Sequence, residues 1–241
     1  MIGNAPRFLV NFISAFIPYR SQRRRVRAIL NAGFTECTDI ITDDMGYKPK
    51  HIKRIVGARG RNLIISADNK YVYKFPTKPR DWETIVSREI KITDEFRKIS
   101  PIKIPQMQLL HRNNMLIRRY EYINGTGLSQ LSETEIYKHI DKLAIQVAHF
   151  VYDIAKLTPK SLKKLQGTTK KPAFMFGWFH NDLYDNLIID KETFEIIAII
   201  DWEDARYTDF MPYFDAPRKQ TVADFMSAVK REYIKIWNSE H

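Results

Sequence analysis

The chain has 241 residues, of which 44% are hydrophobic and 12% aromatic, and it carries a formal net charge of +11. This composition is typical of a globular protein with its own core and excludes a disordered, tail-rich chain. The single cysteine, Cys37, excludes an internal disulfide and cysteine-based zinc sites, and it favours a reducing compartment such as the cytoplasm.

Much of the positive charge lies in a basic N-terminal segment, which we place at residues 1–34. Its first 30 residues contain six arginines and no acidic residue, so more than half of the net charge of +11 lies there. The arginines are Arg7, Arg20, Arg23, Arg24, Arg25 and Arg27. The apolar stretch at residues 8–18 is too short to span a bilayer and lacks a signal-peptide cleavage pattern.

Residues 7–27 leave alternatives open. They have the apolar and basic pattern of a segment that binds an anionic membrane surface, which would place the protein at the inner face of a membrane. The apolar face could instead dock on the protein's own body and leave its arginines in water. We expect no nucleic-acid partner, because no nucleic-acid-binding motif follows.

Residues 35–50 are polar and rich in turn formers, and we predict that this stretch contains a linker. Three β-rich runs follow, at residues 51–58, 63–68 and 71–76. In the third run a period of two places Lys74 on the face opposite the aromatic residues.

A helix is predicted at residues 81–99, because apolar residues recur there at spacings of three and four. Glu89 lies within the apolar stripe of this helix. A buried carboxylate needs a partner, and Lys74 on the neighbouring strand is the candidate. An ion pair that serves structure alone is the alternative.

Two further strands are expected at residues 103–112 and 115–123, before the sequence NGTGL breaks the pattern. A long amphipathic helix then opens with a capping box at Ser132 and Glu135. Residues 158–171 read as a loop, and residues 221–237 as a C-terminal helix. This order predicts an α+β fold of two lobes, with a β-rich lobe at residues 35–123 and a mostly helical lobe at residues 124–241.

Polar residues flank a predicted hairpin in the second lobe. Its strands, LIID and FEIIAIID, are separated by a Lys-Glu-Thr turn. Asp182 and Asn186 precede the first strand, and Asp201 ends the second. Because the open ends of a hairpin lie together, these three oxygen-bearing side chains should converge. Such a set suits Mg²⁺ that also binds phosphates, with one carboxylate to orient an attacking hydroxyl.

The pattern His180-Asn-Asp182…Asn186 followed by IIDWE resembles the aminoglycoside phosphotransferase and choline kinase superfamily, relatives of protein kinases. The resemblance extends over residues 51–215 and includes VYKFP, the helix with Glu89 and the segment YINGTGL. It implies a kinase-like fold and an ATP- and Mg²⁺-dependent transfer of a phosphoryl group to a hydroxyl.

The same resemblance implies roles for individual residues. Asp182 would be the catalytic base, Asn186 and Asp201 would hold magnesium, and His180 would orient the loop. Lys74 would contact the nucleotide phosphates and be positioned by Glu89. The other implied nucleotide-binding residues are Gly57 and Gly60 in a turn over the phosphates, and the backbone of Tyr122 and Ile123 beside the adenine.

Some of these assignments have simpler alternatives. Gly57 and Gly60 could form a plain hairpin turn, and Asp182 with Asn186 could be ordinary turn residues. In the family the asparagine follows the catalytic aspartate by five positions, whereas Asn186 follows Asp182 by four. Asp185 could therefore replace Asn186 as a ligand. Trp178 and Trp202 favour the core over a substrate platform.

The acceptor is not readable from the motif. A small molecule or sugar is expected, and the basic N-terminus favours a sugar of a bacterial envelope glycan, such as lipopolysaccharide or capsule. An aminoglycoside or choline or ethanolamine is an alternative acceptor. The rival from another class is a catalytically silent pseudokinase that binds nucleotide and acts as a scaffold at the membrane.

Overall fold

The computed structural model describes residues 34–56, 62–76, 81–112, 115–166, 174–216 and 218–241. The chain divides into two compact units. The first contains residues 1–83 and 106–122, and the second contains residues 84–105 and 123–241. No helix among the described residues is long and apolar enough to cross a membrane.

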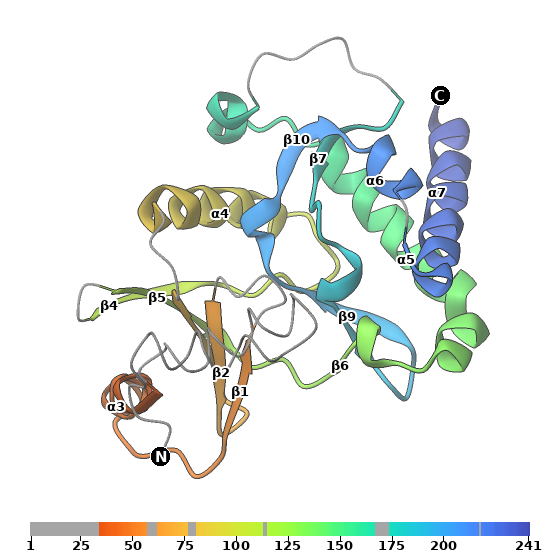
Figure 1. Ribbon diagram of the computed structural model, residues 1–241. Helices are drawn as coiled ribbons and strands as arrows, with labels where there is room; N and C mark the ends of the chain where they lie inside the picture. Colours follow the sequence, from red (N-terminus) through yellow and green to blue (C-terminus); the bar gives the residue numbers. More distant parts are fainter. Residues whose placement is uncertain (1–33, 57–61, 77–80, 113–114, 167–173, 217) are drawn as a thin grey trace, which may run out of the picture. The chain divides into compact units, whose positions relative to one another are not determined.

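The first unit contains a five-stranded antiparallel sheet of order β1-β2-β3-β5-β4 (Figure 1). Its strands are β1 (Ile52–Val56), β2 (Asn62–Ala67), β3 (Tyr71–Pro76), β4 (Gln108–Arg112) and β5 (Met115–Glu121). All five occur where alternating β-rich runs predicted them, so this part of the fold prediction is confirmed.

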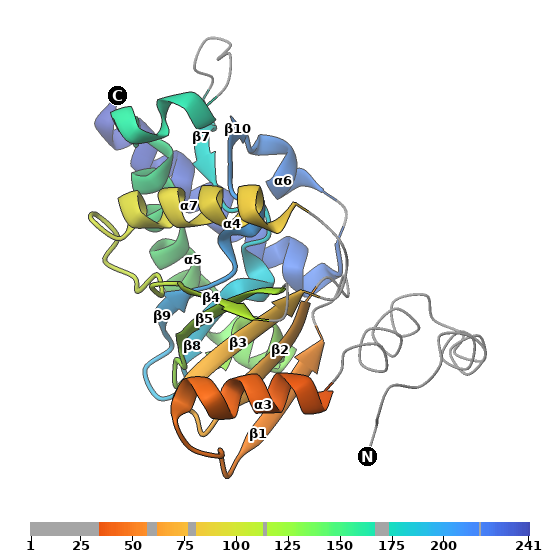
Figure 2. The same ribbon diagram turned by 90° about the vertical axis from the view of Figure 1, so that its left-hand side faces the viewer.

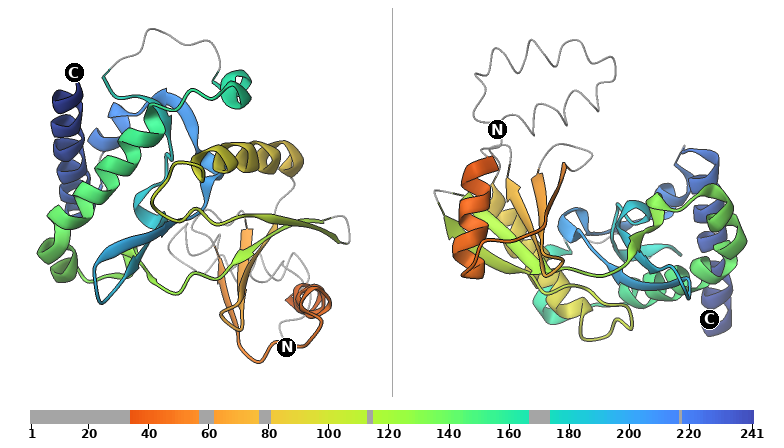
Figure 3. Two further views of the ribbon diagram at one scale, coloured as in Figure 1. Left: turned by 180° about the vertical axis from the view of Figure 1, so that it is seen from behind. Right: turned by 90° about the horizontal axis from the view of Figure 1, so that it is seen from below.

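Most of residues 35–50, where we predicted a linker, form a helix, α3 (Phe34–Met45), and only the residues after Met45 connect it to β1. Cys37, Ile40 and Ile41 recur at helical spacing and are buried against the sheet. Figures 2 and 3 show α3 lying against the sheet of this unit. The hydroxyl of Tyr73 and the guanidinium of Arg119 each lie 2.6 Å from the Asp44 carboxylate, which joins the end of α3 to the sheet. The few apolar residues of α3 suffice because they share one face.

The second unit is mostly helical. In it α5 (Glu133–Ala155) lies beside α7 (Gln220–Glu240), as Figure 1 shows, and the rings of Tyr152 and Tyr233 are 5.5 Å apart between them. The capping box at Ser132 and Glu135 is confirmed at the start of α5. The predicted C-terminal helix is confirmed as α7. Part of the predicted loop at residues 158–171 is a 3-10 helix, η2 (Lys160–Leu165), held by the buried Leu162.

Strands in the second unit form two small sheets. The hairpin β8 (Leu187–Asp190) and β9 (Glu195–Ile199) is confirmed, and β6 (Thr126–Gly127) pairs with β8. A separate pair joins β7 (Phe176–Phe179) to β10 (Arg206–Asp209). The short connecting helices are η1 (Leu128–Gln130), η3 (Tyr184–Asn186), η4 (Trp202–Asp204) and α6 (Met211–Asp215).

The helix predicted at residues 81–99 is confirmed as α4 (Trp82–Phe96). Residues 84–105, which we predicted as part of the first lobe, group with the second unit. The reason is local: α4 contributes Ile92 and Phe96 to the main core, where the Phe96 ring lies 5.3 Å from that of Trp202 and 6.0 Å from that of Trp178.

Candidate functional site

The open end of the β8–β9 hairpin brings Asn186 next to Asp201. The main-chain N–H of Ile200 donates to the carbonyl of Asn186 at 3.1 Å, so Asn186 lies beside the residue that precedes Asp201. Two residues separated by 14 positions in the chain are thereby fixed at one edge of the second unit. The predicted convergence of the Asp182, Asn186 and Asp201 side chains at this edge stays a prediction.

His180 joins the loop before β8 to the end of β9. Its Nδ1 accepts the N–H of Asp182 at 3.3 Å, and its Nε2 lies 2.9 Å from the carbonyl of Ile200. Because Nδ1 accepts, Nε2 carries the proton and donates. The imidazole is fully buried and stacks edge-on against Trp202 at 4.5 Å. It therefore fixes the position of Asp182 relative to Asp201.

Two residues of the site adopt the left-handed backbone conformation that residues other than glycine rarely occupy. They are Asn181, with φ of 62°, and Asp201, with φ of 63°. Asparagine and aspartate tolerate this region best. The Asn181 amide donates to the carbonyl of Asp204 at 3.2 Å, which ties the loop to η4. Strain at a site needs surrounding contacts to hold it, and both segments have them.

The Asn186 side chain points its nitrogen back at the loop. Its Nδ2 donates to the carbonyl of Asp182 at 2.6 Å, and this orients Oδ1 away from that carbonyl. Asn186 is buried and Asp182 half-buried, whereas Asp185, the alternative ligand, is exposed. Asn186 ends η3, where its N–H donates to the carbonyl of Leu183 at 3.0 Å.

Tyr213 is a residue of this site that sequence reasoning missed. Its hydroxyl accepts the N–H of Leu183, the residue after Asp182, at 2.9 Å. Burial raises the pKa of the phenol, so the neutral hydroxyl persists well above neutral pH. The guanidinium of Arg218 lies 4.3 Å from the Tyr213 ring centroid. Nothing in the sequence links position 213 to a loop thirty residues earlier.

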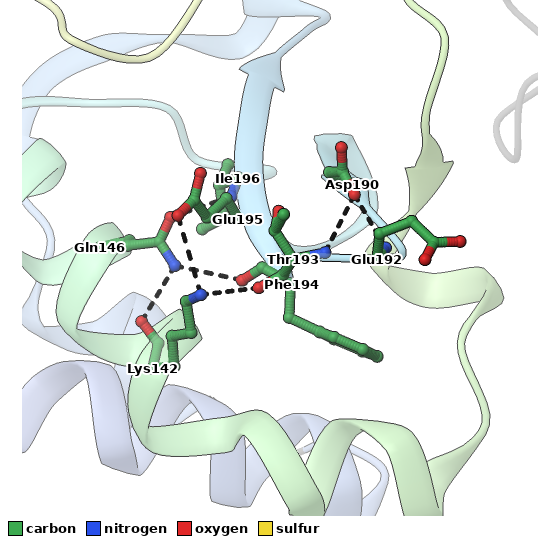
Figure 4. A network of polar contacts seen from close by, with 8 residues as sticks. All are labelled: Lys142, Gln146, Asp190, Glu192, Thr193, Phe194, Glu195 and Ile196. Carbon is green, nitrogen blue, oxygen red and sulfur yellow. Dashed lines mark hydrogen bonds and ion pairs between the residues drawn. The ribbon is translucent and has the colours of Figure 1, made fainter.

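The closed end of the hairpin is anchored on α5 (Figure 4). Gln146 accepts the N–H of Ile196 at 2.9 Å and donates to the carbonyl of Phe194 at 3.3 Å. Lys142 donates to the carbonyl of Thr193 at 2.6 Å. Both ends of the hairpin are therefore held, and its open end presents Asn186 and Asp201 from a fixed base.

The donor set fits magnesium better than a metal that needs a complete protein cage. Among the described residues, no three His, Cys, Asp or Glu side chains gather into a metal-binding group. Asp201 and Asn186 offer two oxygen ligands, and Mg²⁺ is commonly held by one or two carboxylates while water and substrate phosphates complete its shell. The residues present thus fit a cation that arrives with a nucleotide.

In the first unit, Lys74 lies at a buried and positively charged position of β3. It is directly opposite Arg118 on β5, and each side chain is 1% exposed. Arg118 donates to the Asn62 side chain at 2.8 Å, and its guanidinium lies 4.9 Å from the Trp82 ring centroid. Two buried cations side by side require anionic partners. Arg118 was not singled out from the sequence, although a cation inside an apolar strand could have revealed it.

Other predicted residues are only partly placed. Glu89 belongs to the second unit and Lys74 to the first, so their pairing stays a prediction. The N–H of Tyr122 donates to the carbonyl of Lys70 at 2.9 Å, so that group is committed within its own unit. Ile123 is half-buried at the start of the second unit. Gly57, Gly60 and the basic segment 7–27 lie outside the described residues.

Trp178 and Trp202 are 0% and 2% exposed, which confirms them as core aromatics.

No protein-family model matches the sequence, and no curated protein matches it. Solved structures do match. The GDP complex of wild-type aminoglycoside 2'-phosphotransferase-IIIa superposes with a TM-score of 0.61 at 16% identity, over 83% of this chain and 82% of that one.

The chain has the fold of the aminoglycoside phosphotransferases. The ADP-bound aminoglycoside phosphotransferase APH(2'')-Ib matches with a TM-score of 0.56 at 16% identity, over 85% of both chains. The aminoglycoside-3'-phosphotransferase of type VIII matches with a TM-score of 0.56 at 14% identity, over 83% of this chain and 92% of that one. The expected kinase-like α+β fold is confirmed.

Proposed function

We propose that this protein is a magnesium- and nucleotide-dependent phosphotransferase that phosphorylates a hydroxyl of a small molecule or sugar. The observation that carries the proposal is the cross-linked end of the hairpin. The Asn186–Ile200 and His180 hydrogen bonds tie the loop that carries Asp182 and Asn186 to Ile200, the residue before Asp201. Phosphoryl transfer needs little beyond positioned charges and one carboxylate that orients the hydroxyl.

In this proposal Asp182 accepts or orients the proton of the acceptor hydroxyl. Asn186 and Asp201 would hold Mg²⁺, which neutralises phosphate charge when it is bound. Lys74, with Arg118 beside it, would contact the phosphates, since two buried cations on one sheet face suit a polyanion. Gly57, Gly60 and the backbone of Tyr122 and Ile123 remain proposed nucleotide contacts.

The nucleotide is proposed to be ATP. The solved structures with this fold contain GDP, ADP or ATP, so guanine nucleotides are the natural comparison. The test is ADP or GDP release by full-length protein with Mg²⁺ and a panel of hydroxyl acceptors, beside Asp201→Asn. Acceptor-dependent release that the substitution abolishes supports the proposal. Nucleotide release that is indifferent to Asp201, or absent with every acceptor and with water, would reject it.

For the acceptor, we propose a sugar of a bacterial envelope glycan, reached from the inner face of the membrane. The six arginines of residues 1–30 support this, because a basic segment is attracted to anionic lipid. Solved structures with this fold that hold kanamycin, gentamicin or hygromycin B make an aminoglycoside the competing acceptor. Flotation with vesicles of neutral and of anionic lipid separates the two, since only the first proposal requires binding to anionic vesicles.

The alternative of a silent pseudokinase has one observation in its favour, the loop that is one residue short between Asp182 and Asn186. A pseudokinase would bind the nucleotide and release no product in wild type and in Asp182→Ala alike. A phosphotransferase would release product in wild type and lose that release in the variant while it still binds nucleotide.

A further inference from the structure

Two consecutive residues of α4 hold the two ends of η4, the 3-10 turn that follows Asp201. Glu89 accepts the main-chain N–H of Trp202 through Oε1 at 3.1 Å, and the Glu89 side chain is 2% exposed. Arg88 donates to the carbonyl of Ala205 at the other end of the turn. All of these residues lie in the second unit. Arg88 and Glu89 therefore bind α4 to the segment that follows Asp201, the predicted metal ligand.

The Trp202 N–H lies in the peptide plane that Asp201 orients. Asp201 has φ of 63° and ψ of 65°, and ψ is the rotation that sets the direction of the following peptide. L residues adopt this conformation rarely, although aspartate tolerates it better than most, and surrounding contacts help to hold it. A buried carboxylate on the next N–H provides such a hold, because a hydrogen bond to a charged acceptor is stronger than one to a neutral group.

The Trp202 side chain does not depend on this hydrogen bond. Its indole N–H donates to the carbonyl of Ile199 at 3.0 Å, and its ring lies 5.3 Å from Phe96 and 5.8 Å from Phe150. Removal of the Glu89 carboxylate should therefore leave the indole in the core and release the peptide between Asp201 and Trp202. The effect would be local and would fall on the direction of the Asp201 side chain.

We propose that Glu89 is a positioning residue for Asp201: its carboxylate fixes the peptide after Asp201 and so aims that side chain at the metal. The inference rests on the proposed function, in which Asp201 binds Mg²⁺. A carboxylate has two oxygens, and only Oε1 is used by Trp202, so the role is compatible with the predicted pairing to Lys74. The positioning of Asp201 is a role within the second unit, and it is separate from the predicted pairing of Glu89 with Lys74.

The test compares Glu89→Gln, which keeps an acceptor oxygen, with Glu89→Ala, which removes it, and with Lys74→Ala. Amide hydrogen exchange of the full chain is measured first, without metal or nucleotide, over a peptide that contains Trp202. We expect exchange at this position to be slow in wild type and in Glu89→Gln, and at least about tenfold faster in Glu89→Ala, since a buried N–H loses its partner. Glu89→Met fills a similar volume without an acceptor oxygen. It should show the same faster exchange at Trp202, and it replaces Glu89→Ala if that variant unfolds.

Binding of Mn²⁺ in the presence of a non-hydrolysable ATP analogue is then followed by electron paramagnetic resonance. Loss of an outer-shell partner typically weakens metal binding about tenfold or more, so Glu89→Ala should raise the Mn²⁺ dissociation constant by that factor. Glu89→Gln should stay within about threefold of wild type, because its oxygen can still accept from Trp202. Lys74→Ala should weaken nucleotide binding and leave the amide hydrogen exchange at Trp202 unchanged.

Three results would overturn the inference, and they can be told apart. Unchanged exchange at Trp202 in both Glu89→Ala and Glu89→Met, with Mn²⁺ binding intact, shows that Glu89 does not position Asp201. Equal losses in Glu89→Gln and Glu89→Ala that match Lys74→Ala show that the carboxylate serves the lysine alone. Wild-type protein that binds no Mn²⁺ with nucleotide overturns the proposed function, and the positioning role falls with it.

Discussion

The side-chain amide of Asn186 donates a 2.6 Å hydrogen bond to the carbonyl of Asp182, four residues earlier. The bond closes the loop between the proposed base and the proposed metal ligand. It also turns the amide nitrogen of Asn186 toward the loop and leaves the amide oxygen for a metal. This distinguishes Asn186 from Asp185, the other candidate ligand. Asn186 is held in place and buried, whereas Asp185 is exposed.

Asn186→Ala should lower kcat with Mg²⁺ and nucleotide by about a hundredfold, because a metal ligand matters at least as much as an outer-shell partner. Asp185→Ala should change kcat by less than about threefold, since its side chain is exposed and takes no part in the hydrogen bonds that hold the loop. The measurement is steady-state nucleotide release over a Mg²⁺ titration. A larger loss in Asp185→Ala than in Asn186→Ala would transfer the ligand role to Asp185.

Tyr213→Phe removes the hydroxyl that accepts the Leu183 N–H. Leu183 is fully buried, and a buried donor left without its acceptor costs about 1–3 kcal/mol. We expect a loss in that range in the free energy of unfolding, measured with urea, and a lower kcat. Tyr137→Phe is the matched control, because its hydroxyl donates to Asp224 at the surface. Equal effects of the two substitutions would show that the Tyr213 bond does not support the loop.

The hairpin and the fold could be predicted from sequence because each depends on local patterns. The alternation in LIID and FEIIAIID, and the spacing within α4 and α5, carried their own evidence. The helix α3 was missed because its polar residues outnumber the apolar ones that face the sheet. A linker and a sparse amphipathic helix look alike when only composition is considered.

The supporting contacts of the site could not be predicted in the same way. The bonds from Tyr213 to Leu183 and from Glu89 to Trp202 join residues 30 and 113 positions apart through main-chain atoms, which leave no mark on residue type. The left-handed φ of Asp201 likewise depends on its neighbours in space. The sequence pattern supplied the candidate site residues, and it did not predict most of the contacts that hold them.

Gly177 is required by the close approach of another main chain. A Cβ at this position would lie 2.2 Å from the carbonyl oxygen of Ala155, and φ is +156°. Gly177→Ala should therefore destabilise the second unit by about 1–3 kcal/mol or more, the range for overpacking. Gly127→Ala is the control, since its Cβ would meet nothing closer than 3.6 Å. Thermal unfolding measures both, and equal midpoints would contradict the packing described.

Cys37 should make stability depend on pH in alkaline solution. Burial raises the pKa of its thiol from 9.0 to about 12. Above pH 9 the unfolded chain loses this proton while the folded chain keeps it, so stability is complete below pH 9 and falls as the pH rises toward 12. We expect a loss of about 1 kcal/mol between pH 9 and pH 10.

Urea unfolding at pH 8, 9 and 10 measures this loss, with Cys37→Ala as the comparison. The comparison with Cys37→Ala separates the thiol from Tyr73, whose pKa burial raises from its ordinary value of 10.0, because Tyr73 is present in both proteins. The variant should be less stable than wild type at pH 8 because its core contact is lost, and should show a flatter pH dependence. The same slope in both proteins would contradict the buried neutral thiol.

The central claim, that Asp182 acts as the base of a phosphotransferase, is tested most directly by nucleotide turnover and nucleotide binding in Asp182→Asn. The substitution preserves shape and removes the proton acceptor, so kcat should fall by about 10²–10⁴-fold while the affinity for Mg²⁺ and nucleotide stays within about threefold. Asp39→Asn, an exposed aspartate on α3, should match wild type. Turnover in Asp182→Asn equal to that of wild type would contradict the account.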